Sequence, residues 1–485
     1  MPRRLSPEDR EFFILVSWAA FANPFGVERD ELDRRIAGDV NSTLLLEALL
    51  DRLTGRLRAL DVDGEASVTD YVGEERVMME HAIWFMLFHR YAEAFDAHIE
   101  QQLATRDVGP LPFADPLDAD LARRGFPPDR RVRAIDLFFQ MRRAFRFIGE
   151  SLGGPSASMR SLRESLWNNI FTHDVARYER LLWDRMEDFS TILVGETGTG
   201  KGAAAAALGR SGFIPFDAKR GQFAESFVTS FLPLNLSEYP DSLIESELFG
   251  HTKGAFTGAV ANHEGALSRV SPHGVIFLDE IGEVSIPVQV KLLRVLQDRA
   301  YTPVGSHEAR RFAGRVVAAT HRSLSELRAS GKLRDDFYYR LCSDVISVPT
   351  LRQRFEEEPE ELLALVRVIV PRLVGESSEA LEGEVYEAIL SGVGSDYAWP
   401  GNVRELEQCA RRVLLTRRCG PDAGAALGRG ADVAEDELDA KSVLARHCAA
   451  LYERHGTFEQ VARITGLDRR TVKKHVRAAH DAQSV

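Results

Sequence analysis

The feature that most constrains this chain is the stretch "TILVGETGTGKG", residues 191–202. A short apolar run precedes a GxxxxGK pattern, and the "AAAAALGR" that follows it favours a helix. A strand, a glycine-rich turn and a helix in this order present backbone N–H groups and a lysine to phosphate groups. The stretch therefore predicts a phosphate-binding loop made of Gly195, Glu196, Thr197, Gly198, Thr199, Gly200 and Lys201.

A second apolar run, "VIFL", ends in Asp279 and Glu280. Such a pair at the end of a strand suits an ATP site, because one acid holds magnesium and the next acts on the attacking water. We expect Asp279 to bind magnesium through water and Glu280 to orient or deprotonate the attacking water. Gly202 stands where many phosphate loops carry Ser or Thr, so the ion is expected to depend more on other ligands.

Two turn-rich breaks divide the chain. The first, "GESLGGPSAS" at residues 149–158, follows a region rich in helix formers and aromatic residues, and the second, residues 419–440, combines glycines with acids. Between the breaks, short apolar runs alternate with helical stretches, which is typical of a parallel sheet covered by helices. The sequence predicts a mainly helical regulatory domain over 1–148, a flexible acidic linker over 419–440 and a further domain over 441–485.

Composition narrows the class of protein. A chain of 485 residues exceeds one core, and 44% apolar with 28% charged residues is ordinary for a soluble protein. Neither a signal peptide nor an apolar run of membrane-spanning length is found, so we expect a cytoplasmic protein without membrane contact. The net charge of -12 argues against polyanion binding by the whole surface. The cysteines lack the spacing of a zinc site or a disulfide framework, so all are expected to be reduced: Cys342, Cys409, Cys419 and Cys448.

Seven blocks occur in order between about Gly149 and Leu415: "GETGTGK", "ESELFGHTKGAFTGA", "FLDEIGE", "VKLLRVLQ", "AATHRSL", "KLRDDFYYRL" and "WPGNVRELEQ". With them the chain resembles the AAA+ bacterial enhancer-binding proteins, the activators of RNA polymerase that carries sigma-54. The resemblance implies an AAA+ α/β ATPase subdomain over 149–348, a helical lid over 349–418, and ATP and Mg2+ as cofactors.

One block contains the loop Gly254, Ala255, Phe256, Thr257, Gly258 and Ala259. From the residues alone, a Phe in so glycine-rich a frame either packs back onto its own domain or waits for a partner surface. The resemblance implies a partner: in the family this loop contacts sigma-54, and ATP hydrolysis moves it to convert a closed promoter complex into an open one.

Four further nucleotide-site residues follow from the resemblance. Asn235 matches the family's switch asparagine, which holds the catalytic glutamate. Thr320 and His321 match the first sensor, and Arg404 matches the second.

Arg334 and Arg340 match arginines that act on the neighbouring subunit's nucleotide. An arginine supplied in this way neutralises charge on the transferred phosphoryl group and accelerates the reaction by about 10³ to 10⁵. The resemblance therefore implies a homo-oligomer, from a dimer to a hexameric ring.

The sequence departs from the family in two places. Gly202 stands where the family often has Glu, which leaves nucleotide affinity open. The segment 209–235, between the helix after the phosphate loop and Asn235, is longer than is common and leaves the second strand of the sheet open.

Residues 457–479 read as two helices joined at 466–468, with Asp468 able to cap the second. This helix carries basic residues unopposed by any acid from 469 to 477: Arg469, Arg470, Lys473, Lys474 and Arg477. The pattern is that of a helix-turn-helix and resembles the Fis-like domain of many such activators. Arg470, Thr471 and Lys474 are the candidates to contact base edges of double-stranded DNA. A solvated basic helix is the alternative.

Together these features predict a sigma-54-dependent activator: an ATPase motor tethered to DNA upstream of promoters, with the sigma-54 holoenzyme as its client. Two alternatives stay open, a DNA-binding regulator with a degenerate, non-hydrolysing AAA+ core and an AAA+ remodeller of another client. Residues 1–148 lack the acidic pair, later Asp and distal Lys of a phosphoacceptor domain. An unknown ligand or protein partner is therefore expected there, and helical packing without a ligand is the alternative.

Overall fold

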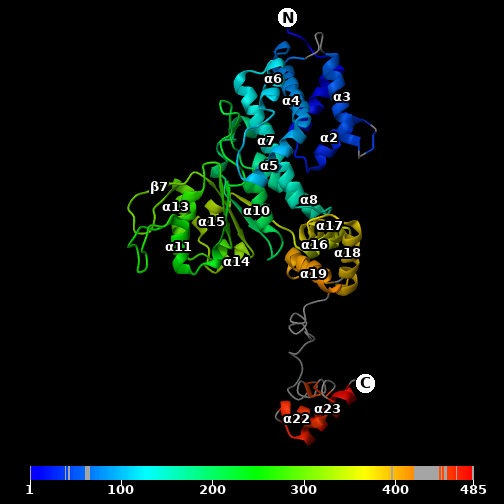
Figure 1. Cartoon of the computed structure of the whole chain (residues 1–485), viewed down its shortest axis with the longest axis vertical. Coiled ribbons are helices and arrows are strands. Elements are labelled where there is room, and N and C mark those ends of the chain that lie inside the picture. The colour runs from blue at the N-terminus through cyan, green and yellow to red at the C-terminus, as the bar shows by residue number, and fades with distance from the viewer. Residues whose placement is uncertain are drawn as a thin grey trace. The chain divides into compact units, whose positions relative to one another are not determined.

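The computed structural model describes residues 2–38, 40–41, 44–60, 66–394, 397–419, 447–448, 451–452, 456–465 and 467–482. The chain divides into two compact units, Met1–Arg418 and Cys419–Val485, which are drawn in Figure 1. Within the described ranges, no helix combines the length and the apolar character needed to cross a membrane.

The N-terminal part of the first unit is helical, as predicted. Its α-helices are α1 (Pro7–Phe21), α2 (Val27–Ala37), α3 (Leu45–Ala59), α4 (Gly73–Arg90), α5 (Ala92–Thr105), α6 (Ala114–Arg123) and α7 (Pro128–Ser151). Ser6 caps α1 by accepting a hydrogen bond from the Asp9 amide, and Pro7 fits the first turn because its missing N–H is not needed there. Phe13 of α1 and Leu87 of α4 are fully buried between these helices.

A five-stranded parallel sheet follows, in the order β4-β5-β8-β1-β9. Its strands are β1 (Thr191–Val194), β4 (Phe231–Asn235), β5 (Val275–Asp279), β8 (Arg315–Thr320) and β9 (Asp344–Ser347). The strands are largely apolar because helices cover both faces. Ile192 and Ile276 share one core with the helices of residues 241–341, whereas Leu193 and Phe277 share the other core with α7 and α10 (Lys201–Arg210). The predicted parallel α/β architecture is confirmed.

The first unit also contains further helices and two short strands. They are α8 (Ala157–Phe171), α9 (Val175–Leu181), α11 (Asp241–Phe249), α12 (Ala266–Arg269), α13 (Ile286–Asp298), β6 (Ala300–Tyr301), β7 (Arg310–Arg311), α14 (Leu324–Ala329), α15 (Asp335–Leu341), α16 (Leu351–Glu357), α17 (Glu361–Val374), α18 (Glu379–Val393) and α19 (Asn402–Thr416). Helices α16 to α19 form a separate group beside the sheet (Figure 1). Arg354 and Glu361 form a buried ion pair in this group, and Glu361 also accepts a hydrogen bond from the Ser156 amide at 2.9 Å. The pair thereby fixes the helical group to the segment that precedes α8.

The long segment 209–235 forms a small hairpin that faces the N-terminal helices. Its strands are β2 (Phe216–Asp217) and β3 (Gln222–Phe223). The Phe223 ring stacks on Phe139 of α7 with 4.0 Å between ring centroids, and the Phe216 amide donates to Asp136 of α7 at 2.7 Å. The extra residues of segment 209–235, which the sequence left unexplained, thus join the sheet to α7.

The second unit contains α22 (Phe458–Thr465) and α23 (Arg469–Ala482). Cys448, Val461, Val472 and Val476 form its buried cluster. Of the acidic linker predicted over 419–440, residues 420–440 lie outside the described residues.

The expectation of four reduced cysteines is wrong for two of them. Cys409 and Cys419 are disulfide-bonded, whereas Cys342 and Cys448 are free. Arg417, directly after α19, adopts the left-handed conformation with φ 58°. Cysteine spacing identifies zinc sites and disulfide frameworks, whereas the bonding of two isolated cysteines depends on how the fold places them.

Candidate functional site

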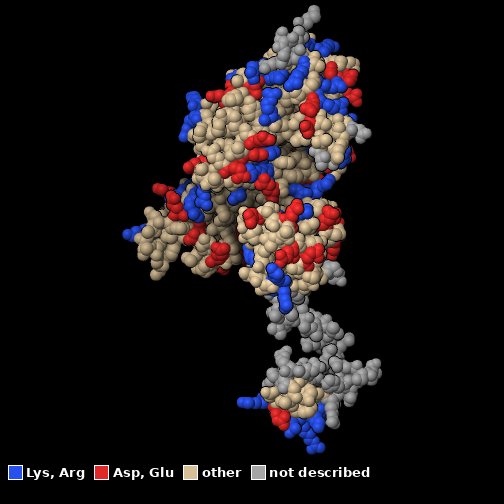
Figure 2. All heavy atoms as spheres, turned by 45° about the vertical axis from the view of Figure 1, so that its right-hand side comes forward, with Lys and Arg blue, Asp and Glu red and all other residues tan. Residues whose placement is uncertain are grey.

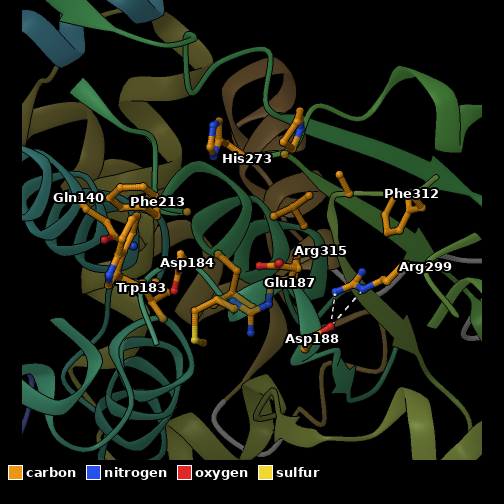
Figure 3. Close-up of a pocket in the computed structure, with 18 of the residues that line it drawn as sticks. Gln140, Trp183, Asp184, Glu187, Asp188, Phe213, His273, Arg299, Phe312 and Arg315 are labelled. Atoms are coloured by element: carbon orange, nitrogen blue, oxygen red, sulfur yellow. Dashed lines mark hydrogen bonds and ion pairs between the residues drawn. The ribbon is translucent and has the colours of Figure 1, made fainter. Parts of the chain in front are cut away.

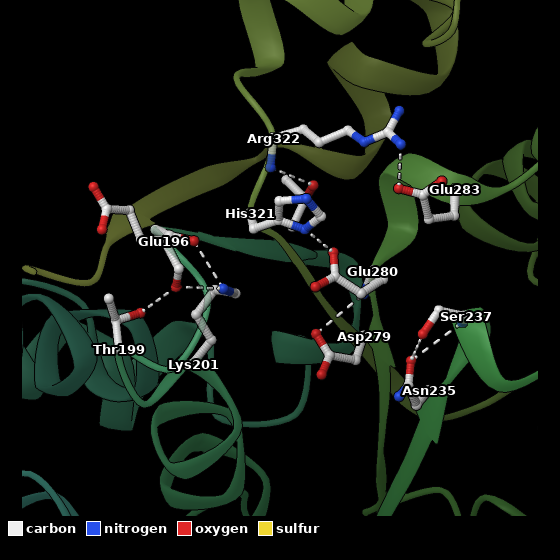
Figure 4. Close-up of polar contacts among 12 residues, drawn as sticks. Glu196, Thr199, Lys201, Asn235, Ser237, Asp279, Glu280, Glu283, His321 and Arg322 are labelled. Atoms are coloured by element: carbon white, nitrogen blue, oxygen red, sulfur yellow. Dashed lines mark hydrogen bonds and ion pairs between the residues drawn. The ribbon is translucent and has the colours of Figure 1, made fainter. Parts of the chain in front are cut away.

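The phosphate loop lies between β1 and α10 at the carboxyl edge of the sheet. Gly198 and Gly200 have φ of 79° and 105°, a conformation that favours glycine, and a Cβ on Gly198 would lie 2.2 Å from the Gly401 carbonyl oxygen. Lys201 Nζ donates to the carbonyl oxygens of Gly195 and Glu196 at 2.7 and 2.9 Å (Figure 4). Burial lowers the pKa of Lys201, while the charges of Glu280 and Asp279 act to raise it. The loop lysine therefore lies within electrostatic reach of the acid pair.

The acid pair ends β5, next to the phosphate loop. Glu280 has the left-handed φ of 57°, which is costly for a residue other than glycine and is characteristic of functional positions. Its amide donates to Asp279 Oδ1 at 3.0 Å. Burial and the charge of Glu280 raise the pKa of Asp279. Two carboxylates held this close destabilise each other's charge, which a divalent cation relieves.

The hydrogen-bond partner of Glu280 is His321, whose Nδ1 lies 2.7 Å from Glu280 Oε2 (Figure 4). Asn235, to which the resemblance assigns that contact, lies opposite Asp279 in the register of β4 and β5. Its Oδ1 instead accepts hydrogen bonds from the amide and hydroxyl of Ser237, and its Nδ2 donates to Glu238 at 3.0 Å. The structure brings Asn235 to the site without bonding it to Glu280.

A cavity of about 490 Å³ joins these groups to the helices that follow the sheet. Its lining includes residues 197–203, Asn235, Asp279, Glu280, Arg372 and Arg404. The charge of Arg404 acts to lower the pKa of Lys201 and of Asp279, so this arginine is electrostatically coupled to the site. Thr320 does not line the cavity; its Oγ1 accepts a hydrogen bond from the Arg322 amide at 3.1 Å.

Asn402, at the start of α19, is a site residue that the sequence analysis missed. Its Nδ2 donates to Glu196 Oε2 at 3.2 Å and to the Thr197 carbonyl at 3.0 Å, while its Oδ1 accepts from the Leu351 amide at 2.8 Å. Asn402 therefore ties the phosphate loop to the helical group. The available signal was its position in the block "WPGNVRELEQ", two residues before Arg404.

The loop 254–259 is closed by its own backbone. The Gly254 amide donates to the Ala259 carbonyl at 2.8 Å, and Gly254 and Gly258 have φ of 83° and 103°. Phe256 remains 40% exposed, with only one edge-on ring contact, to His251 at 4.9 Å between centroids. Phe256 is thus neither a buried anchor nor a fully free side chain.

Comparison with known proteins identifies the module that carries this site. The family model described as the sigma-54 interaction domain matches residues 174–347. This region is similar to that family, and we refer to residues 174–347 as the sigma-54 interaction domain. The resemblance drawn from the seven sequence blocks is thereby confirmed.

Relatives of the sigma-54 interaction domain occur among curated proteins. The Nif-specific regulatory protein of Klebsiella pneumoniae is 37% identical over 272 residues, which are 56% of this chain and 45% of that protein. The transcriptional regulatory protein ZraR of Klebsiella oxytoca is 40% identical over 231 residues, 47% of this chain and 48% of that protein. The chain thus spans about half the length of the curated relatives it matches. Among solved structures, NtrX from Brucella abortus in complex with ADP is 19% identical, with 75% of this chain and 80% of that chain covered and a TM-score of 0.43.

Arg334 and Arg340, which the resemblance assigns to a neighbouring subunit's nucleotide, do not line the cavity at the phosphate loop. Arg334 is exposed and pairs with Asp336 at 2.7 Å. Arg340 donates through Nε to the Leu296 carbonyl at 2.9 Å. The structure therefore does not bring Arg334 and Arg340 to Lys201 and the acid pair of their own subunit.

A second cavity of the sigma-54 interaction domain, of about 470 Å³, lies at the amino ends of β5 and β8 (Figure 3). Arg315 in its wall donates to the Phe189 carbonyl, to Asn169 Oδ1 and to Thr191 Oγ1. Asp188 and Arg299 pair at 3.1 Å at its edge. None of the predicted site residues lines this cavity, and Arg299 and Arg315 are held by protein groups, so we assign it a structural role.

In the second unit, Asp468 caps α23 as expected, accepting hydrogen bonds from the amides of Arg470 and Thr471. Arg469 is not unopposed, because it pairs with Glu459 of α22 at 2.7 Å. Lys473 and Lys474 are exposed, and Figure 2 shows basic side chains gathered on this unit. The side chain of Arg477 lies outside the described residues.

Proposed function

We propose that this chain is a sigma-54-dependent transcription activator. It binds DNA upstream of promoters, assembles into a ring and uses ATP hydrolysis to move the 254–259 loop against sigma-54. One observation carries the proposal: a single sigma-54 interaction domain combines a formed phosphate loop and acid pair with an exposed Phe256.

The residues of the cavity fit ATP and Mg2+. Gly198 and Gly200 hold the turn in a left-handed conformation, which suits a loop whose backbone N–H groups bind phosphates. Lys201 brings a positive charge to the same place. Asp279 would hold Mg2+ through water, and the ion would neutralise negative charge on the phosphates.

Glu280 acts on the attacking water in this proposal. His321 holds Oε2 of its carboxylate, which leaves Oε1 to accept the proton of the water. A carboxylate fixed at one oxygen loses little orientation freedom when the water is placed, which favours the reaction. Asn235, in hydrogen-bond contact with Ser237 and Glu238, serves as the switch that alters this arrangement.

Hydrolysis requires a second subunit, because Arg334 and Arg340 do not line the cavity of their own subunit. Supplied from the neighbour, they neutralise charge on the transferred phosphoryl group. Arg404 senses the nucleotide from α19 in the cavity wall, whereas His321, directly after β8, acts through its contact with Glu280. The ring is therefore part of the active site.

The second unit binds DNA in this proposal. Arg470, Lys473, Lys474 and Arg477 contact phosphates, and Arg470, Thr471 and Lys474 reach base edges. Arg469 contributes less than its charge suggests, because Glu459 already neutralises it.

The test is open-complex formation by sigma-54 RNA polymerase with Thr257→Ala. We expect this variant to keep ATP turnover and to lose activation, because Thr257 lies at the tip of the loop and outside the nucleotide cavity. Thr416→Ala, which changes an exposed threonine at the end of α19, is the matched control and should activate normally. Normal activation by Thr257→Ala would remove the loop from the mechanism.

A further inference from the structure

The N-terminal helices enclose a cavity of about 460 Å³, a volume within the range of small-molecule sites. Its walls come from α1 to α5, from α7 and from α8. Aromatic side chains dominate the lining: Phe21, Trp84, Phe85, Phe88, Phe138 and Trp167. Flat aromatic faces of this kind favour an aromatic ligand, which can stack on them or meet their edges.

His89 is the polar group of this wall with hydrogen-bonding capacity to spare. Neither ring nitrogen has a hydrogen-bond partner in the described part of the chain, and the ring makes edge contacts with the rings of Phe85 and Phe88. Burial, reinforced by Arg29 and Arg142, lowers the pKa of His89 to about 3, so the imidazole is neutral and offers one N–H donor and one acceptor. The indole N–H groups of Trp84 and Trp167 likewise lack a partner among the described residues.

The two cations of the wall are already paired with carboxylates. Arg29 pairs with Asp33 at 2.8 Å, and Arg142 pairs with Asp96 at 2.5 Å. Asp30 and Glu93 also line the cavity. Because these carboxylates leave no unpaired cation in the lining, an anionic ligand is disfavoured and a neutral one fits.

Helix α7 separates this cavity from the nucleotide-binding region. Phe138, Met141 and Arg142 of α7 line the cavity. On another side of the same helix, Arg143 donates to the carbonyl oxygens of Arg210 and Gly212 at 2.6 and 2.8 Å, at the C-terminal end of α10. A change in the packing of α7 would therefore act directly on α10, the helix that begins at Lys201.

Gln140 and Asp136 extend this junction along α7. Gln140 donates to the Ser211 carbonyl at 3.2 Å and accepts from the Tyr178 hydroxyl at 2.9 Å. Asp136 accepts from the Phe216 amide of the β2–β3 hairpin. Three consecutive turns of α7 thus hold the end of α10 and the hairpin after it.

We propose that the cavity is an effector site for a small, neutral, bicyclic aromatic compound that carries a carbonyl group, and that α7 transmits its binding to α10. His89 donates to the carbonyl, and the aromatic wall holds the rings. The binding site stands on its own residues, whereas the effect on ATP turnover rests on the proposed function.

The first experiment measures binding to the full chain by isothermal titration calorimetry. The probes are 2-acetonaphthone, which is neutral and carries a carbonyl; 2-ethylnaphthalene, which has nearly the same shape without it; and 2-naphthoate, which is an anion. We expect 2-acetonaphthone to bind with a Kd of about 10 µM and the other two at least about tenfold more weakly. Equal or tighter binding of either other probe, or no binding of 2-acetonaphthone, overturns the proposal.

Variants assign that binding to the cavity. His89→Phe keeps the ring and removes its nitrogens, so the affinity for 2-acetonaphthone should fall by about tenfold while that for 2-ethylnaphthalene is unchanged. Ala92→Phe adds a ring at a position in the cavity wall and should weaken both. His173→Phe changes an exposed histidine outside the cavity and is the matched control. Unchanged affinities in both His89→Phe and Ala92→Phe would place the probe elsewhere and overturn the site.

The second experiment measures ATP turnover with and without saturating 2-acetonaphthone. We expect a change of at least about threefold in the wild type, and none in Arg143→Met, which should still bind the probe. If the wild type binds the probe but hydrolyses no ATP, the proposed motor fails while the site survives. If the wild type hydrolyses ATP at the same rate with and without bound probe, the transmission through α7 is overturned.

Discussion

The two ends of α10 are in contact with different kinds of groups. At its N-terminal end, Lys201 faces a cavity shared with two acids, whereas at its C-terminal end Arg143 of α7 binds the last carbonyl groups. The first end is arranged for a ligand, and the second is fixed by the N-terminal helices. The proposed nucleotide site is therefore not an independent module, because the helix that starts it is held at its other end by the region expected to regulate it.

The largest effect is expected at the N-terminal end. Glu280→Gln keeps the size of the side chain and removes the proton acceptor, so ATP turnover should fall by about 10² to 10⁴ with ATP binding retained. Phosphate release and nucleotide titration measure the two quantities. Glu283→Gln changes a nearby acid that pairs with Arg322, and it should stay within about fivefold of the wild type. Wild-type turnover in Glu280→Gln would break the assignment of this end.

The next largest effect concerns α7, which holds the C-terminal end of α10, and it is a dependence of the unfolding free energy on pH. Burial raises the pKa of Asp136 to about 7, whereas in the unfolded chain this pKa is about 4. Folding therefore favours the protonated carboxyl, and the free energy of unfolding should fall by up to about 4 kcal/mol as pH rises from about 4 to about 7. Asp136→Asn should remove this slope in urea unfolding at about pH 5 and about pH 8. Asp107→Asn, at an exposed acid, should retain it; equal slopes in both variants would exclude Asp136 as the cause.

A smaller loss is expected when the contact between α7 and α10 is cut. Arg143→Met fills a similar volume and leaves the carbonyls of Arg210 and Gly212 without their charged donor, which should cost about 2 kcal/mol of unfolding free energy. Tryptophan fluorescence in urea measures this change. Arg160→Met, at an exposed arginine that pairs with Asp30, is the control and should cost less than about 1 kcal/mol. If Arg143→Met is as stable as the control, α7 does not hold this end of α10.

The smallest effect is expected when the same substitution, Gly to Ala, is made at each end of α10. A Cβ on Gly202 meets no atom within 4 Å, so Gly202→Ala should stabilise the chain by about 0.5 to 1 kcal/mol through helix propensity. A Cβ on Gly209 would lie 2.2 Å from the Phe231 ring, so Gly209→Ala should destabilise it. Thermal unfolding of both variants checks the signs. Changes of the same sign would show that the two ends do not differ in packing.

The sequence predicted the residues at the N-terminal end of α10 but not the contacts at its C-terminal end. The loop that ends at Lys201 and the acids that end β5 were predicted because each lies within a short motif whose chemistry requires adjacent residues. The bond from His321 to Glu280 and the bonds from Asn402 to the phosphate loop were not predicted. The contact of Arg143 with α10 was missed as well. These contacts join residues far apart in the chain, and no local pattern records which distant side chain will fill a given position.

The same limit applies to the cavity of the N-terminal helices. Its wall combines side chains from α1 to α5, α7 and α8, and each helix alone shows only the apolar periodicity of an ordinary core. The helical character of this region was therefore predictable, whereas the cavity and its neutral His89 were visible only after folding.

The central claim, hydrolysis at the N-terminal end of α10 across a subunit boundary, is tested most directly by mixing two inactive variants. Glu280→Gln lacks the proton acceptor, and Arg334→Ala lacks the arginine proposed to act on the neighbour. In a mixed ring, an intact Glu280 of one subunit meets an intact Arg334 of the next. We predict that each variant alone loses ATP turnover by at least about 10² and that the mixture recovers a substantial fraction of it. A mixture as inactive as its components, or full activity of Arg334→Ala alone, would contradict the account.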